Sequence, residues 1–203
     1  MISYMLLRWA WRCCAMLFLV AMLMPPQRAY GQGLELGGGW AHTTGNNGTD
    51  GYGVGVAWWL NRRTTLAANY DSGWDTSSLS TFAVGSGLVT TKSHLRDLLF
   101  GPRIFFSSQW TDRHKLQPFG EAQFGVSWLD QAVTANLPGF SGASASGNGF
   151  SWMLGGGAEY LIDPHWSARM NLDFLRTHIA DQGQSHLRWV LGLTYTLGKR
   201  GPA

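Results

Sequence analysis

The stretch HLRWVLGLTYTLG, residues 186–198, decides the fold of this chain. Every second position in it carries a large apolar side chain: Leu187, Trp189, Leu191, Leu193, Tyr195 and Leu197. The positions between them carry smaller or polar residues: Arg188, Val190, Gly192, Thr194 and Thr196. A period of two residues is typical of a β-strand, in which successive side chains point to opposite faces. A half-buried strand of a soluble sheet shows the same alternation. Aromatic rings along the apolar face and an arginine on the other favour a strand between lipid and a polar lumen.

The end of this stretch resembles a known assembly motif. Gly192, Tyr195 and Leu197 are spaced as in the terminal β-signal by which bacterial outer-membrane proteins are delivered for barrel assembly, although Val190 stands where a polar residue is usual. The resemblance implies that the barrel-assembly machinery is a partner of this strand. In that arrangement the leucine face contacts lipid and Arg188 points into the lumen.

Residues 1–31 are predicted to be a cleaved secretory signal peptide. Arg8 and Arg12 provide a positive amino-terminal region, and the apolar run that follows, residues 13–24, is short of the roughly 20 residues that a spanning helix needs. Ala29 and Gly31 supply the small residues required for cleavage before residue 32. The expected destination of the mature chain is the bacterial outer membrane.

The composition of residues 32–203 excludes several kinds of partner, site and membrane span. The three arginines of the predicted signal peptide equal the whole formal net charge of +3, so the mature chain is expected to be neutral and no nucleic-acid partner is expected. Both cysteines, Cys13 and Cys14, leave with the signal peptide, which excludes disulfides and thiolate metal sites from the mature chain. No long apolar run and no linker occurs there, so we expect a single domain without helical membrane spans.

Turn chemistry divides residues 32–203 into strand-like stretches. We predict eight of them, at residues 34–44, 51–60, 64–75, 94–107, 116–130, 150–162, 166–179 and 186–198. Tight turns alternate with connections rich in Gly, Ser, Thr and Asn, at residues 45–50, 76–93, 131–149 and, shorter, 181–185. Alternating short and long connections indicate a barrel whose two rims face different compartments. The predicted fold is all-β, an eight-stranded antiparallel up-and-down transmembrane β-barrel.

The two faces of these stretches differ in chemistry. Residues expected to face lipid are Leu36, Trp40, Tyr52, Val54, Val56, Trp58, Leu66, Tyr70, Leu98, Phe100, Ile104, Phe106, Phe124, Val126, Trp128, Leu154, Tyr160, Met170, Leu172 and Phe174. The opposite parity carries the charges, from which we predict a lumen network of Glu35, Arg103, Glu121, Glu159, Arg169, Asp173 and Arg188. Counting from the adjacent turns sets Glu159 opposite Arg169, and Arg103 opposite Glu121. A barrel of about eight strands is filled by its own side chains, so these charges are expected to plug the lumen.

Three motifs carry a resemblance to a family. Phe100-Gly101-Pro102-Arg103, Pro118-Phe119-Gly120-Glu121-Ala122 and Gly155-Gly156-Gly157-Ala158-Glu159-Tyr160, together with the terminal strand, resemble the small OmpA-like/OmpX-like outer-membrane β-barrel family. The resemblance covers nearly the whole of residues 32–203. It implies an up-and-down barrel used for envelope integrity, adhesion or surface contact. The peptidoglycan-binding domain of the OmpA pattern is not found after the last strand.

No enzymatic or metal motif is expected to operate here. A lipid A deacylase-type barrel resembles this one in size, but it requires a His-x-Ser pair on the second-last strand, where this chain reads His178-Ile179-Ala180. His178 and His186 flank one tight connection, and a solvated role for them is favoured over a metal or pH-sensitive site. No catalytic residue, cofactor or metal ligand is predicted.

The function expected from the sequence is therefore structural or adhesive. The expected partners are outer-membrane lipids including lipopolysaccharide, the barrel-assembly machinery and an extracellular surface partner bound through the longer loops, and the barrel is expected to be monomeric. A lipid A-modifying hydrolase and a small pore remain as alternatives.

Overall fold

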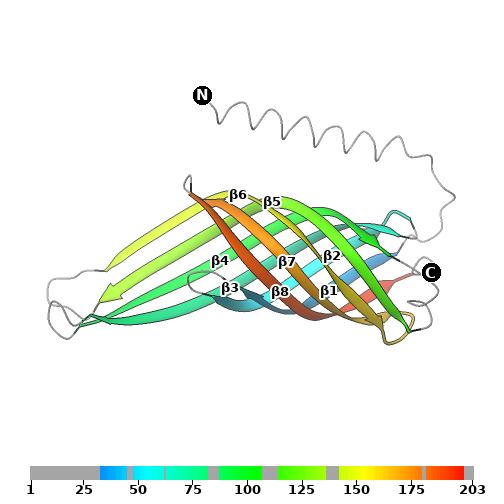
Figure 1. Ribbon diagram of the computed structural model, residues 1–203, viewed down its shortest axis with the longest axis horizontal. Helices are drawn as coiled ribbons and strands as arrows, with labels where there is room; N and C mark the ends of the chain where they lie inside the picture. The colour runs from blue at the N-terminus through cyan, green and yellow to red at the C-terminus, as the bar shows by residue number, and fades with distance from the viewer. Residues whose placement is uncertain are drawn as a thin grey trace, which may run out of the picture. The chain divides into compact units, whose positions relative to one another are not determined.

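The computed structural model describes residues 33–44, 48–61, 63–81, 87–106, 114–135, 142–179 and 182–198. The predicted signal peptide, residues 1–31, lies outside them. The described residues form one closed barrel of eight strands (Figure 1). The strands are β1 (Leu34–Thr43), β2 (Thr49–Trp59), β3 (Thr64–Thr81), β4 (Gly87–Phe105), β5 (Leu116–Ala135), β6 (Ala143–Leu161), β7 (Trp166–Ile179) and β8 (Gln182–Leu197).

Each strand pairs antiparallel with the next along the chain, and β8 closes the barrel by pairing with β1. The terminal strand is thus half of the closing seam, with Gly192 opposite Gly39 and Tyr195 opposite Leu36. The predicted fold class is confirmed. Within the described ranges, no helix has the length and apolar character to cross a bilayer.

Side chains along each strand alternate between the lipid-facing outside and the lumen of the barrel. Leu36, Trp58, Leu98, Leu154 and Met170 each keep 45–59% of their surface exposed on the outside of the barrel. Their sequence neighbours of opposite parity are buried or half-buried inside it. Apolar groups exposed in this continuous way are stable only against lipid, and closure of the sheet leaves no backbone edge within the bilayer.

Tight turns close one end of the barrel, which we call the short-turn end. The Asn61 side-chain oxygen accepts hydrogen bonds from the backbone N–H groups of Arg63 (2.8 Å) and Thr64 (2.9 Å). Asp163 accepts from His165 and Trp166, at 2.7 Å each. Asn and Asp favour such turns because their side chains replace a backbone acceptor.

At the other end of the barrel, three of the connections are shorter than predicted. Residues 76–93 and 131–149 were expected to be loops, but most of them continue β3, β4, β5 and β6. The connection expected at residues 181–185 is also mostly strand, because β8 begins at Gln182. The predicted barrel strands were therefore too short on these elements. Ser, Thr and Gly in these stretches are typical of loops, but cross-strand hydrogen bonding outweighs that local preference.

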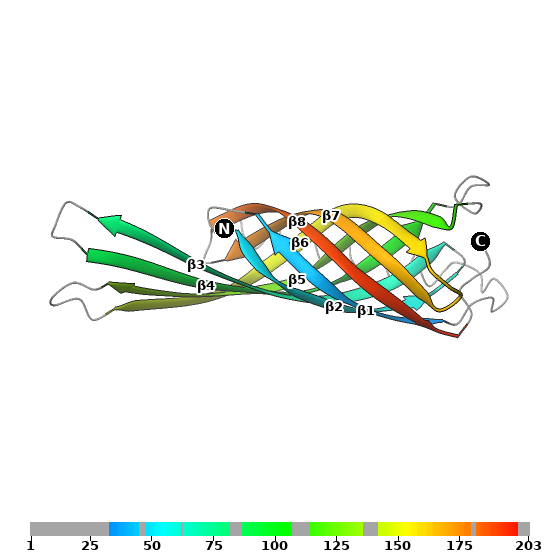
Figure 2. The same cartoon turned by 90° about the horizontal axis from the view of Figure 1, so that it is seen from below.

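The four longer strands run on past the other four as a separate feature. Figure 2 shows β3 and β4 projecting well beyond β1 and β2, and Figure 1 shows β5 and β6 doing the same. We call the parts formed by residues 75–81, 87–93, 131–135 and 143–148 the projecting sheet. It stands at the end opposite the short turns.

Candidate functional site

The lumen begins with an aromatic layer at the short-turn end. Trp59, Phe105 and Phe119 are each 3% exposed and form one apolar cluster. The ring centroids of Trp59 and Phe105 are 4.8 Å apart, and those of Phe105 and Phe119 are 5.5 Å apart. These three buried rings fill lumen space at this level.

A first ion-pair cluster lies directly above these rings. Arg103 Nη2 lies 2.9 Å from Glu121 Oε2, and its Nη1 lies 3.4 Å from Glu35 Oε1. Arg169 Nε donates to Glu159 Oε1 at 2.8 Å, and the same guanidinium also pairs with Glu35. Glu35 therefore joins the two arginines, and every carboxylate of the cluster is at most 2% exposed.

Phe119 connects the aromatic layer to this cluster. The guanidinium carbons of Arg103 and Arg169 lie 5.0 and 5.6 Å from the centroid of its ring. Cations at this distance are attracted to an aromatic ring, and more strongly where water is excluded. The rings and charges therefore form one packed plug.

A second ion-pair cluster lies further along the lumen. Arg188 pairs with Asp71, and its Nη2 lies 3.2 Å from Asp173 Oδ2. Amide side chains extend the first cluster, because Gln123 donates to Glu121 at 2.8 Å and Asn171 does the same at 2.8 Å. Charges are tolerated in such an interior only when each is paired, and these arginines are.

The structure places all seven predicted network residues in the lumen. Glu159 is the cross-strand partner of Arg169, and Arg103 is the partner of Glu121. Sequence reasoning missed Asp71 and the three rings. Parity contained the signal for each. Asp71 follows Tyr70, Trp59 follows Trp58, and Phe105 lies between Ile104 and Phe106, and these neighbours were all assigned to lipid; Phe119 has the parity of Glu121, which was assigned to the lumen.

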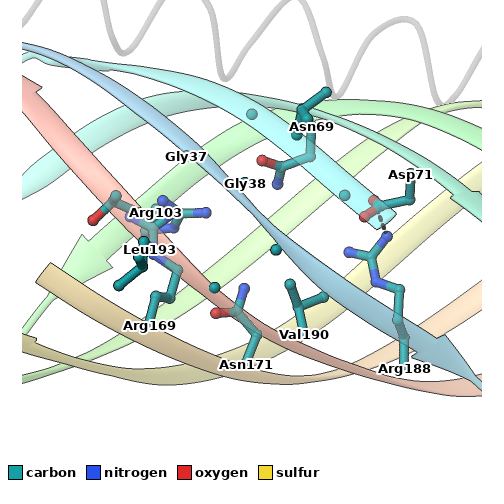
Figure 3. A pocket seen from close by; sticks show the side chains of 16 residues that line it. Gly37, Gly38, Asn69, Asp71, Arg103, Arg169, Asn171, Arg188, Val190 and Leu193 are labelled. Carbon is teal, nitrogen blue, oxygen red and sulfur yellow. Dashed lines mark hydrogen bonds and ion pairs between the residues drawn. The ribbon is translucent and has the colours of Figure 1, made fainter. Parts of the chain in front are cut away.

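One wall of the lumen is made of glycine. Gly37, Gly39, Gly53, Gly55 and Gly192 line a cavity of about 40 Å³ beside the two clusters (Figure 3). In the view of Figure 3, Arg103 and Arg169 lie at one end of the cavity and the Asp71–Arg188 pair at the other. A cavity of this volume has room for a few water molecules but for no larger solute.

The glycines let two chain segments approach closely. A Cβ on Gly39 would collide with the backbone carbonyl of Leu191 on β8, and a Cβ on Gly53 would collide with the Asp71 carboxylate. The closing seam and the second cluster therefore both depend on the absence of side chains at these positions.

The predicted assembly-signal residues lie on β8 near the short-turn end. Leu197 is 45% exposed on the lipid side. The Tyr195 ring lies 4.9 Å from that of Trp166 and 5.7 Å from that of His165. Gly192 faces the lumen, opposite Gly39.

His178 and His186, which flank one predicted turn, are not cross-strand partners of each other. His178 is the cross-strand partner of Gly183, whereas His186 pairs with Leu175 and its Nδ1 lies 2.8 Å from the Thr44 carbonyl oxygen. No group of three metal-ligating side chains occurs in the part of the chain that the structure describes.

The projecting sheet has two edges. Residues 75–81 of β3 pair only with β4, and residues 143–148 of β6 pair only with β5, as far as the described ranges extend. The backbone groups on the other side of each edge face outward from the sheet. Unpaired edges of this kind bind further strands readily.

The sequence matches the outer membrane protein β-barrel domain over residues 14–196. The chain belongs to this family. It is therefore a barrel of the bacterial outer membrane. No curated protein matches it.

Several solved structures are similar to this outer-membrane barrel. Ail, the attachment invasion locus protein of Yersinia pestis, in complex with the heparin analogue sucrose octasulfate, is 12% identical, with a TM-score of 0.52 over 81% of this chain and 97% of that chain. The outer membrane protein OprG from Pseudomonas aeruginosa is 12% identical, with a TM-score of 0.50 over 85% of this chain and 99% of that chain. A major outer membrane protein from Thermus thermophilus is 12% identical, with a TM-score of 0.50 over 81% and 99% of the two chains. At this identity the similarity shows a shared fold.

Proposed function

We propose that this outer-membrane barrel is a plugged, non-enzymatic protein that contacts partner surfaces outside the cell through its projecting sheet. The observation that carries the proposal is the pair of unpaired edges on β3 and β6. An extended segment of a partner protein gains main-chain hydrogen bonds when it adds to such an edge. The plugged lumen supports the same function, because it leaves no path for a solute through the barrel.

The β6 edge carries none of the devices that prevent pairing. Its residues are Ala143, Ser144, Ala145, Ser146, Gly147 and Asn148, with no charge, no proline and no large side chain. Proteins commonly protect exposed edges with lysine, proline or a bulge. An edge left open in this way is suited to a partner strand.

The proposal includes the orientation of the barrel in the outer membrane. With an even number of strands, both ends of the barrel chain lie at the short-turn end, which faces the periplasm in outer-membrane barrels of this kind. The projecting sheet then stands outside the cell. Export by the predicted signal peptide and a monomeric state belong to the same proposal.

Trimming the hairpins tests the role of the sheet. Replacing residues 76–92 and 132–144 by tight turns should leave the barrel assembled, because the eight-stranded body pairs without them. Attachment of expressing cells to a protein-coated surface should be lost. Full attachment by the trimmed barrel, at equal surface level, would contradict the proposal.

A point variant separates the edge from the rest of the sheet. Ser144→Lys places a charge on the free edge of β6, and Ala132→Lys places the same charge on its cross-strand partner in β5, one strand away from the edge. The edge variant should reduce attachment and the control variant should retain it. Equal attachment by both variants would show that the β6 edge does not bind the partner surface.

The assembly signal is tested on β8. Replacing Tyr195 and Leu197 by Asp should leave the protein in the periplasm for degradation, because the terminal strand would lose its lipophilic face. The fractionation of the variant and its shift on heating in gel electrophoresis report the outcome. Assembly equal to the parent would show that the terminal strand is not read as a signal.

Two rival functions have direct assays. Mass spectrometry of lipid A from a deletion strain should match the parent, since loss of a hydrolase would leave acylated substrate behind. Planar-bilayer recordings of the purified barrel should show no steady large conductance, since Trp59, Phe105 and Phe119 fill lumen space.

A further inference from the structure

The outward face of β4 changes chemistry at one position. From the short-turn end its outward side chains are Ile104, Pro102, Phe100 and Leu98, of which Ile104, Phe100 and Leu98 are between 44% and 49% exposed. The next three outward positions are Arg96, His94 and Lys92. The apolar side chains mark where β4 crosses lipid, so this basic stripe begins where the hydrocarbon ends.

Neighbouring strands hold the stripe in place. The rings of His94 and Trp74 stack with centroids 4.7 Å apart, and the Ser72 hydroxyl lies 2.9 Å from His94 Nε2. Arg96 forms an ion pair with Asp130 on β5. These contacts across three strands arrange the side chains before any ligand is bound.

A hollow of about 490 Å³ lies over this part of the sheet. Three cross-strand rows line it: Trp74, His94, Asp130 and Ser146 form the first, Asp75, Ser93, Gln131 and Ala145 the second, and Thr76, Lys92, Ala132 and Ser144 the third. The lining combines an aromatic face, hydroxyl groups, a side-chain amide, a lysine and two acidic residues, Asp75 and Asp130. It has the hydrogen-bonding groups that a hydroxylated ligand requires.

Two cationic side chains in or beside the hollow, Lys92 and Arg96, can still bind an anion. Arg96 Nε is buried without a hydrogen-bond partner, although the same guanidinium pairs with Asp130. Lys92 is exposed, and no ion pair to it occurs among the described residues. The Arg96 side chain is 36% exposed, so an anionic group between it and Lys92 would be attracted by both positive charges.

We propose that this hollow, with Arg96 just outside its rim beside Asp130, binds the phosphorylated sugar headgroup of an outer-leaflet glycolipid, with Lys92 and Arg96 on the phosphate and Trp74 against the sugar. The site lies at the upper limit of the lipid-facing band, so a ligand anchored in the leaflet reaches it. The hydroxyls of Thr76, Ser144 and Ser146 match a sugar better than the headgroup of a simple phospholipid. The inference rests on the orientation proposed above and not on the contact role of the edges.

The histidine in the stripe provides an internal reporter. Burial and the neighbouring Arg96 both lower the pKa of His94 from its usual value. A bound phosphate would raise that pKa again, because a nearby anion stabilises the imidazolium.

The test uses the full mature barrel in nanodiscs of three compositions: phosphatidylcholine alone, phosphatidylcholine with phosphatidylglycerol, and phosphatidylcholine with lipopolysaccharide. Lipid retained after detergent exchange is measured by native mass spectrometry, and the His94 titration is followed by NMR. The parent should retain lipopolysaccharide in preference to phosphatidylglycerol and show a raised His94 pKa only with lipopolysaccharide. Equal retention of both anionic lipids would overturn the assignment to a sugar headgroup.

Charge reversal locates the site. The Lys92→Glu, Arg96→Glu double variant should weaken lipopolysaccharide retention by at least about tenfold, since each basic residue near an anionic surface contributes on the order of a factor of five. The single Lys92→Glu variant, at an exposed position, keeps the test valid if the double variant does not fold. Arg63→Glu, the same reversal at the short-turn end, should retain lipid as the parent does. Unchanged retention in both Lys92 variants would overturn the proposal, whatever the attachment assays of the edge show.

Discussion

The four strands of the projecting sheet continue strands of the eight-stranded barrel body, yet the two regions differ in what surrounds each residue. In the body every strand has a hydrogen-bonded neighbour on both sides, and side chains from all eight strands meet in the lumen. In the projecting sheet only four strands remain, and β3 and β6 each have one neighbour. Each arginine in the lumen is buried and pairs with two carboxylates, whereas Arg96 and Asp130, on the outer face at the base of the projecting sheet, form one half-exposed pair. Stability therefore resides in the body, and the sheet has surfaces left for contact.

The largest expected effect comes from comparing the same kind of substitution in the lumen and on the outer face at the base of the projecting sheet. Arg169→Met removes the cation paired with Glu159 and leaves Glu35 only its longer pair with Arg103, so it should lower the free energy of unfolding by about 3–5 kcal/mol. Arg96→Met removes a half-exposed pair and should cost under about 1 kcal/mol. Urea unfolding of both variants in lipid vesicles measures the difference. Equal losses would mean that the body does not dominate stability.

A double-mutant cycle sharpens the same contrast. Glu159→Gln combined with Arg169→Met should show a coupling of about 1–3 kcal/mol, because the two side chains share one buried pair. The corresponding cycle on Asp130 and Arg96 should give about 0.5 kcal/mol or less, as for exposed pairs. Absence of coupling between Glu159 and Arg169 would contradict the lumen register.

Replacing a glycine by alanine should also cost more stability in the barrel body than in the projecting sheet. Gly39→Ala brings a methyl group onto the Leu191 carbonyl at the closing seam and should destabilise the barrel by about 1–3 kcal/mol. A Cβ on Gly147, in the projecting sheet, meets the Ile179 side chain at 2.8 Å, and a side chain rotates away more easily than backbone. Unfolding temperatures of the two alanine variants, relative to the parent, provide the comparison. A larger loss for Gly147→Ala would contradict it.

The smallest expected effect is a change in the pKa of His94, at the base of the projecting sheet. Burial, and then the charge of Arg96, lower the pKa of His94, while Asp130 opposes them. Arg96→Gln should therefore raise that pKa and Asp130→Asn should lower it further, both measurable by NMR titration. Since the folded pKa lies below the unfolded value of about 6.5, the unfolded chain binds the proton more tightly, and acidification through this range weakens the folded sheet. Shifts in the opposite directions would show that these two charges do not act on His94.

The amino-acid sequence alone predicts the strand pattern and the pairs next to turns. The alternation from Leu187 to Leu197 separates lipid-facing from lumen-facing side chains, because the period of a strand is two. Counting outward from the turn at Pro164 sets Glu159 opposite Arg169, since a tight hairpin sets the register of its own two strands. The aromatic layer follows equally from parity, but it has no polar residue to draw attention to it.

By itself, the sequence determined which side chains face lipid, how many strands close the barrel and which residues oppose each other across a tight turn. Each of these depends on neighbours in the chain. Only the tertiary structure decided that Glu35 meets Arg169 and that Arg188 meets Asp71, residues separated by 134 and 117 positions. Those contacts depend on the curvature and stagger of the closed sheet, which no local pattern encodes. The projecting sheet was decided in the same way, because Ser- and Gly-rich segments become strands where a neighbouring strand supplies the hydrogen bonds.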